Sequence, residues 1–298
     1  MRVRRQSSVN RQAGTSTTVR SGKWRWSAPS AACALLIVAA LLAGCRSPRE
    51  QIVARPTRHS IRSEQMLVLT DFKLAKSHPL VQDLIELRAQ VAETLELPEQ
   101  GEDVTVYIFD SEAEYRKYLE ATWPDLPERR AYFIGTPKEL AVYTYWGDRI
   151  QEDLRHEYTH GLLHAHLDFV PLWLDEGLAE YFEVIGPEPG SVNVEYASRL
   201  ATSLKNGWQP DLDRLERLEG FAQMQRTDYQ EAWAWVHFML HSSPDTRQVL
   251  LDYLRELDAG PELEPLSGRL ARELPALTPR FLAYLGTLST TGRWTETL

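Results

Sequence analysis

Two histidines and a glutamate within five residues have the types and spacing to hold and use a metal ion. The stretch is His156-Glu157-Tyr158-Thr159-His160, inside a segment with helical periodicity. Residues four apart lie on one face of a helix, so both imidazoles could reach one Zn²⁺. Glu157 projects to the side, where its carboxylate could act as the general base on a zinc-bound water. The pattern alone is moderately specific, because the chain has eight histidines, and it needs corroboration.

Corroboration lies 13 residues further on, in Trp173-Leu-Asp-Glu-Gly-Leu-Ala-Glu-Tyr181. HEYTH followed by WLDEGLAEYFE resembles the gluzincin metallopeptidases, and more closely the bacterial peptidase MA-like proteins. The resemblance covers about residues 140–183 and implies a zinc metallopeptidase. It also implies that Glu176 is the third ligand and that Glu180 orients a histidine ligand, a contact that fixes the imidazole tautomer. The alternative for Glu180 is a solvated charge on the helix.

Two further histidines compete for a place at the metal. His166 follows His156 by ten residues, the metzincin spacing, but that geometry needs a glycine where the chain has Leu163. An unbroken helix would direct His166 away from the paired imidazoles. His164 lies on their face, yet histidines at i, i+4 and i+8 span about 12 Å and cannot all bind one ion. We expect His164 to line the cleft or to be structural.

The oxyanion-stabilising group has two candidates. Tyr229 opens Tyr-Gln-Glu-Ala-Trp and resembles the tyrosine of the YxKG-type segment in aminopeptidase-N-like gluzincins. Glu231 and Ala232 replace the Lys and Gly of that segment. The alternative for Tyr229 is a tyrosine packed on the core. The second candidate is His237, by analogy with thermolysin-like sites.

The expected substrate strand lies before the zinc helix. The amine-binding GxMEN segment of the aminopeptidase branch is replaced by Gly135-Thr-Pro-Lys-Glu-Leu140, so we expect an endopeptidase. Residues 140–145 are predicted to form an edge strand that pairs with an extended substrate backbone. Tyr143, Tyr145 and Trp146 would then line the cleft. The alternative is an ordinary hairpin strand.

The sequence pattern of the helices and strands around these residues predicts an α+β fold. A small mixed α/β N-terminal subdomain covers residues 59–148, and a mainly helical, zincin-like subdomain with the zinc site covers residues 149–298. Alternating and buried apolar runs predict strands near 66–70, 104–109, 132–134 and 140–145. Helical periodicity predicts helices near 80–95, 149–166, 172–184, 194–205, 229–241 and 245–257, and Ser111 is expected to cap another.

Residues 1–44 have the features of a lipoprotein signal peptide. A basic region precedes an apolar run, Ala31 to Gly44, whose 14 residues fall short of the about 20 that span a bilayer. The run ends Leu-Ala-Gly-Cys45, which resembles the bacterial lipobox. We therefore expect a lipid on Cys45, a tether over 45–58, and export to the bacterial cell envelope. The alternative is an uncleaved N-terminal anchor.

Charge and composition exclude other classes of protein. The chain has 33 basic and 42 acidic residues, but seven of the basic ones lie in 1–44; from Cys45 onward 26 basic residues face 42 acidic ones, a net charge of −16. So acidic a body repels nucleic acid and anionic lipid surfaces. The hydrophobic content of 43% excludes a disordered chain. Cys33 is the only other cysteine, so a disulfide or a Cys-type zinc site is not expected in the mature chain.

The expected partners are a peptide or protein substrate and, through the lipid, a membrane, but no nucleic acid. The function predicted is hydrolysis of peptide bonds with Zn²⁺ as the cofactor. A zinc-containing module that binds peptides without cleaving them is the main alternative, although a binder would need no base at Glu157. The third hypothesis is a structural protein of the cell envelope in which the HEYTH motif occurs by chance.

Overall fold

The computed structural model describes the backbone of residues 54–186, 190–257 and 263–291. The predicted signal peptide, Cys45 and most of the tether lie outside the described residues. Residues from Arg55 onward belong to one compact unit. A mixed sheet in the N-terminal half is followed by helices, which confirms the predicted α+β class. Within the described ranges, no helix combines the length and the apolarity that crossing a membrane requires.

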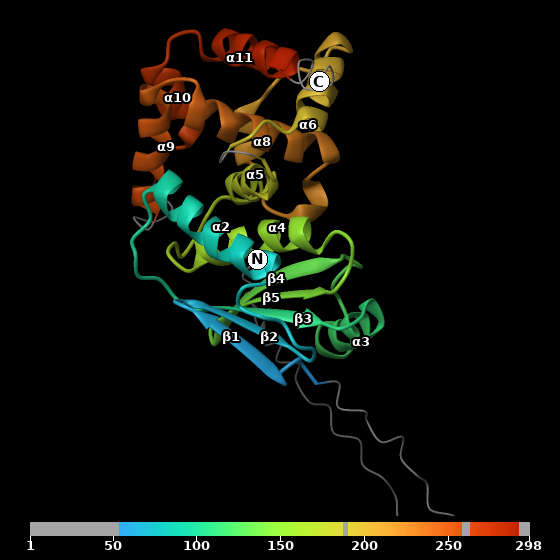
Figure 1. Ribbon diagram of the computed structural model, residues 1–298. Coiled ribbons are helices and arrows are strands. Elements are labelled where there is room, and N and C mark those ends of the chain that lie inside the picture. Colours follow the sequence, from blue (N-terminus) through green and yellow to red (C-terminus); the bar gives the residue numbers. More distant parts are fainter. Residues whose placement is uncertain (1–53, 187–189, 258–262, 292–298) are drawn as a thin grey trace, which may run out of the picture. The chain divides into compact units, whose positions relative to one another are not determined.

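The sheet has five strands in the order β1-β2-β3-β5-β4 (Figure 1). Strands β2, β3 and β5 run parallel, whereas β1 and β4 are antiparallel to their neighbours. The expected edge position of 140–145 is therefore wrong, because Val142 pairs with Val106 on one side and with Phe133 on the other. The edge strand of this hairpin is β4. The strands are β1 (His59–Ser63), β2 (Met66–Thr70), β3 (Val104–Phe109), β4 (Ala131–Thr136) and β5 (Glu139–Tyr145).

The two faces of the sheet carry different layers. Helices α2 (Pro79–Leu95) and α4 (Ile150–His164) cover one face, where Val142 and Phe133 join the main hydrophobic core. The other face carries α3 (Glu112–Thr122), whose first turn is capped by the Ser111 hydroxyl as expected.

Tyr143 and Tyr145 lie on the α3 face, because side chains alternate along a strand. Tyr143 stacks on Tyr107 with ring centroids 5.0 Å apart, and Tyr145 contacts Tyr115. Trp146 contacts Phe72 and His78 instead. The prediction that these three aromatic residues line a cleft beside the HEYTH helix is therefore wrong.

The helical half packs around a buried pair, α5 and α8. Gly177 of α5 faces the backbone of α8 so closely that a Cβ there would lie 2.8 Å from the Ala232 carbonyl oxygen. Only glycine allows the two helices to approach in this way. Helix α5 also packs on α4, so it connects the sheet layer to α8. The helices are α5 (Leu172–Glu183), α6 (Val194–Lys205), α7 (Leu212–Glu216), α8 (Arg226–His241), α9 (Pro244–Glu256), α10 (Leu266–Glu273) and α11 (Leu277–Thr291), with a short 3₁₀ helix, η1 (Phe221–Gln223).

Candidate metal centre

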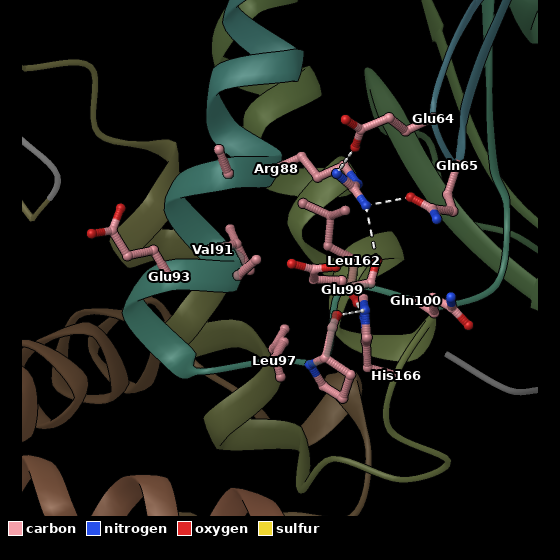
Figure 2. Close-up of a pocket in the computed structure, with 13 residues that line it drawn as sticks. Glu64, Gln65, Arg88, Val91, Glu93, Leu97, Glu99, Gln100, Leu162 and His166 are labelled. Carbon is pink, nitrogen blue, oxygen red and sulfur yellow. Dashed lines mark hydrogen bonds and ion pairs between the residues drawn. The ribbon is translucent and has the colours of Figure 1, made fainter.

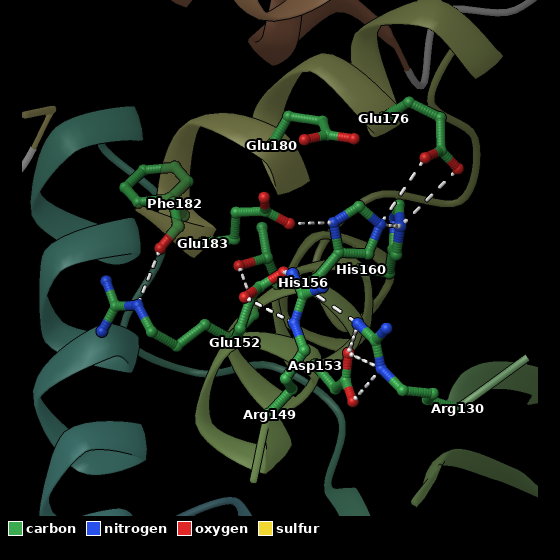
Figure 3. A network of polar contacts seen from close by, with 12 residues as sticks. Arg130, Arg149, Glu152, Asp153, His156, His160, Glu176, Glu180, Phe182 and Glu183 are labelled. Atoms are coloured by element: carbon green, nitrogen blue, oxygen red, sulfur yellow. Dashed lines mark hydrogen bonds and ion pairs between the residues drawn. The ribbon is translucent and has the colours of Figure 1, made fainter. Parts of the chain in front are cut away.

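The three predicted metal ligands converge between α4 and α5 (Figure 3). The Nε2 atoms of His156 and His160 lie 3.3 Å apart. Glu176 places one carboxylate oxygen 3.6 Å from the first and the other 3.7 Å from the second. Donor atoms of a tetrahedral ion with bonds of about 2.0–2.1 Å are about 3.3–3.4 Å apart. The spacing therefore fits a single small ion.

The outer ring nitrogens are held by carboxylates. His156 Nδ1 donates to Glu183 over 2.9 Å, and His160 Nδ1 donates to Asp175 over 2.8 Å. Because an ionised carboxylate only accepts hydrogen bonds, each Nδ1 carries a proton, and each ring that loses its other proton turns an Nε2 lone pair inward. This is the tautomer that a metal ligand needs. The second oxygen of Asp175 meets His164 Nε2 at 3.1 Å, so His164 has a structural position beside the pair.

The prediction for Glu180 needs correction, since the acids on the two outer nitrogens are Asp175 and Glu183. Glu180 instead accepts a hydrogen bond of 2.8 Å from the Tyr196 hydroxyl. Burial, and then the charge of Glu183, raise the pKa of Glu180 to about 8. Sequence reasoning missed both orienting acids. One signal was available: Glu183 follows Glu176 by seven residues, two helical turns, and so lies on the same face of α5.

The buried charges at this centre favour a cation. Burial alone would lower the pKa of His156, but its hydrogen bonds with Glu176 and Glu183 outweigh that effect and raise the pKa. The pKa of His160 is also raised, against the effect of burial, by Asp175 and Glu176. Burial alone would raise the pKa of Asp175, but the facing His160 holds it well below its usual range. The cluster therefore stabilises a positive charge, which a proton or a metal ion could supply.

Glu157 is held at the edge of the sheet. Its Oε2 atom accepts a hydrogen bond of 2.5 Å from the backbone N–H of Phe133. Phe133 belongs to β4, so the N–H is one that points away from the neighbouring strand β5. The carboxylate proposed as general base thus lies between the histidine helix and the free edge of β4.

Tyr229 lies within electrostatic range of the centre. Burial, and then the charge of Glu176, raise the pKa of its hydroxyl, while the charge of Arg129 acts in the opposite direction. The phenol is therefore protonated at neutral pH and can donate a hydrogen bond.

His237, the second oxyanion candidate, has both ring nitrogens engaged elsewhere. Its Nε2–H donates to the Gly190 carbonyl oxygen over 3.0 Å, and its Nδ1 lies 2.7 Å from the Tyr284 hydroxyl. Burial, and then the neighbouring His241, lower the pKa of His237 to about 4. A neutral histidine with its one N–H committed to a carbonyl has no donor left for an oxyanion, so this candidate is dropped.

His166 is not part of the convergent ligand group and lines a pocket beside α2 (Figure 2). Its ring nitrogens face the carbonyl oxygens of Leu162 and Pro98 at 2.8 and 3.0 Å. The ring lines a separate pocket of about 670 Å³ between α2 and the end of α4, together with Arg88 and Glu99. The fold therefore does not bring His166 together with His156 and His160, as a metzincin-like ligand set would require.

The centre combines three converging donors, the Glu157 carboxylate and a phenol, Tyr229, that responds to the charge of Glu176. Such a set can bind an ion, move a proton and donate a hydrogen bond to a developing negative charge. In comparisons with known proteins, no family model matches the chain and no curated protein matches it significantly.

Proposed function

We propose that the protein is a zinc-dependent metallopeptidase of the gluzincin type that hydrolyses peptide bonds as an endopeptidase. The observation that carries the proposal is the convergence of His156 Nε2, His160 Nε2 and Glu176, with both outer nitrogens held by acids. Two imidazoles and one carboxylate with a remaining open position are the donor set of a catalytic zinc ion. Calcium and magnesium prefer sets made of oxygen atoms.

The residues around the ion have separate tasks. Bound zinc would supply a Lewis acid that polarises the scissile carbonyl and acidifies a water molecule. Glu157 takes the proton of that water and then delivers it to the leaving nitrogen. The Phe133 N–H keeps the carboxylate in place. Tyr229 donates a hydrogen bond to the oxyanion, a contact that strengthens as charge develops.

The substrate backbone would pair with β4 rather than with β5. Strand β4 has β5 on one side only, and its outer edge lies beside Glu157 through the Phe133 contact. Backbone pairing on such an edge accepts many side-chain sequences. An internal segment of an extended chain can bind this way, which agrees with an endopeptidase.

The proposed location of the protein is inferred from residues 1–44, the predicted lipoprotein signal peptide. We propose that Cys45 carries a lipid and tethers the peptidase to the cell envelope. Cys45→Ser should abolish lipid labelling and release or misprocess the protein. Unchanged membrane fractionation at the normal processed size would contradict the assignment.

Glu157→Gln tests catalysis, because the amide keeps the shape of the side chain but cannot accept the proton. Wild-type protein should cleave unfolded casein in a chelator-sensitive manner. The variant should lose about 10²–10⁴-fold in rate while keeping its zinc. Glu152→Gln, on an exposed part of the same helix, is the matched control and should remain active.

Equal cleavage by wild type and Glu157→Gln would show that another group is the base. Peptide binding with zinc present but no cleavage by either protein would favour the alternative, a zinc-containing binding module.

A further inference from the structure

Arg129 lies at the rim of the metal centre, two residues before β4. Its guanidinium carbon lies 5.9 Å from the ring centroid of Tyr132 and 5.4 Å from that of Phe221. The charge of the guanidinium also acts on the Tyr229 hydroxyl, whose pKa it lowers. The side chain thus connects the beginning of the edge strand with the beginning of α8.

The contact with Tyr132 places this charge near Glu157, because the next residue, Phe133, donates its backbone N–H to the Glu157 carboxylate. Burial, then Arg129, then Glu157 act on the pKa of Tyr132, the net direction being upward. Tyr229 is affected by both Glu176 and Arg129. One guanidinium therefore acts on a phenol that responds to Glu157 and on a phenol that responds to Glu176.

Arg129 differs from its neighbour Arg130 in how its charge is balanced. Arg130 forms an ion pair of 2.6 Å with Asp153 (Figure 3). For Arg129, the ion pairs found within the described residues provide no carboxylate partner, and the residue is exposed. Its backbone is fixed by the Tyr115 hydroxyl, which donates to its carbonyl oxygen over 3.0 Å. The positive charge is therefore held in position but not neutralised.

An unneutralised arginine is unusual beside so acidic a centre. Glu157, Glu176 and Glu183 would repel an anionic substrate group, and Arg129 offsets that repulsion at one end of β4. A guanidinium has five N–H donors in a planar fork that matches a carboxylate. Contacts with rings on its face leave the N–H groups along its edge for a ligand.

We propose that Arg129 binds a carboxylate of the peptide substrate and gives the enzyme a preference for acidic peptides. This inference rests on the proposed peptidase function. The carboxylate could belong to an Asp or Glu side chain or to the substrate C-terminus, since both present the same two oxygens. Binding of a C-terminus would convert the endopeptidase into one that removes short C-terminal fragments.

Three matched peptides separate these sources: one amidated and neutral with a Gln, one amidated with Glu in its place, and one with Gln and a free C-terminus. Their dissociation constants would be measured on the full-length chain in the Glu157→Gln background, and kcat/KM on the active enzyme. An ion pair at an exposed arginine contributes about 0.2–1 kcal/mol, so one acidic peptide should be favoured by up to about 5-fold over the neutral one. The favoured peptide identifies the source.

Variants of the two arginines test whether Arg129 is responsible. Arg129→Gln should bring the ratio of acidic to neutral peptide close to one, and Arg129→Lys should restore part of it, because a point charge lacks the bidentate fork. Arg130→Gln should keep the wild-type ratio. Ratios are compared because the charge of Arg129 also acts on Tyr229, so its loss can change the rate on every peptide.

Equal binding of all three peptides by wild type, or an unchanged ratio in Arg129→Gln, would overturn the inference. Cleavage without carboxylate preference would reject the role of Arg129 alone. Carboxylate-selective binding without cleavage by the active enzyme would reject the peptidase and retain the role of Arg129.

Discussion

Helices α4 and α8 each contain two neighbouring histidines four residues apart whose partners can be compared, His156/His160 on α4 and His237/His241 on α8. Their ring centroids lie 5.0 and 4.5 Å apart, so neither spacing nor proximity separates them. Their partners do. The α4 pair meets three carboxylates, whereas His237 contacts a carbonyl and a tyrosine and His241 contacts the Tyr181 hydroxyl.

Because their partners differ, the pKa values of the two histidine pairs shift in opposite directions. Carboxylates raise the pKa of His156 and of His160, whereas burial lowers the pKa of both histidines on α8. A metal ion needs charge compensation that the α4 pair has and the α8 pair lacks. Two imidazoles one helical turn apart are thus necessary for this kind of metal site. The carboxylates around them decide which histidine pair can bind the ion.

Glu176→Ala should have the largest effect on the α4 pair. It removes the charged oxygen donor and leaves two imidazoles, so zinc affinity should fall by more than the about 100-fold that loss of an orienting acid can cost. Competition with a chromophoric chelator measures the affinity. His166→Ala, in the separate pocket beside Arg88, is the control and should bind zinc normally. Retention of zinc by Glu176→Ala together with its loss from His166→Ala would move the third ligand to His166.

Asp175→Asn and Glu183→Gln should each weaken zinc binding by about 10–100-fold, because an orienting acid fixes the tautomer and raises the basicity of its histidine. Glu180→Gln should have a smaller effect, since its partner is Tyr196. The same chelator competition ranks the three variants. A larger loss in Glu180→Gln than in the other two would return the orienting role to Glu180.

The sequence was sufficient for the parts of the site that depend on local spacing. His156 and His160 occupy successive turns of one helix with Glu157 directly after His156, and a second motif suggested Glu176. The alternation and periodicity of apolar residues likewise predicted most helices and strands, because they follow from neighbours along the chain.

The strand order and the acids that contact the outer ring nitrogens depend instead on packing between residues far apart in the sequence. Residues 131–136 and 139–145 both look like buried strands, and only the parallel pairing of β5 with β3 decides which is at the edge. Similarly, Glu180 and Glu183 were both plausible partners for a histidine. The rotation of α5, set by the approach of Gly177 to Ala232, turns Glu183 to His156 and Glu180 to Tyr196.

The histidines of the α8 pair should affect the pH dependence of the free energy of unfolding rather than metal binding. Since the pKa of His237 is lowered to about 4, the unfolded state binds a proton first as pH falls below about 6.5. The stability contributed by neutral His237 is therefore complete above that pH and is lost as pH falls toward 4, by about 2 kcal/mol between pH 7 and 5.

His237→Gln should remove this part of the pH dependence, measured by urea denaturation at pH 7 and pH 5. The groups facing His237 are His241 on α8, Tyr181 on α5 and Tyr284 on α11, and the two tyrosines do not titrate in this range. His241→Gln is therefore the informative companion variant. An identical loss of stability with pH in wild type and His237→Gln would show that His237 is not the buried group that titrates.

Zinc content per chain in wild type, His160→Ala and His241→Ala tests the central claim most directly. The three proteins would be produced with zinc supplied and measured by elemental mass spectrometry after removal of free metal. The carboxylate environment of α4 predicts one equivalent in wild type, one in His241→Ala and none in His160→Ala. Absence of zinc from wild type, or its loss from His241→Ala and retention in His160→Ala, would contradict the account.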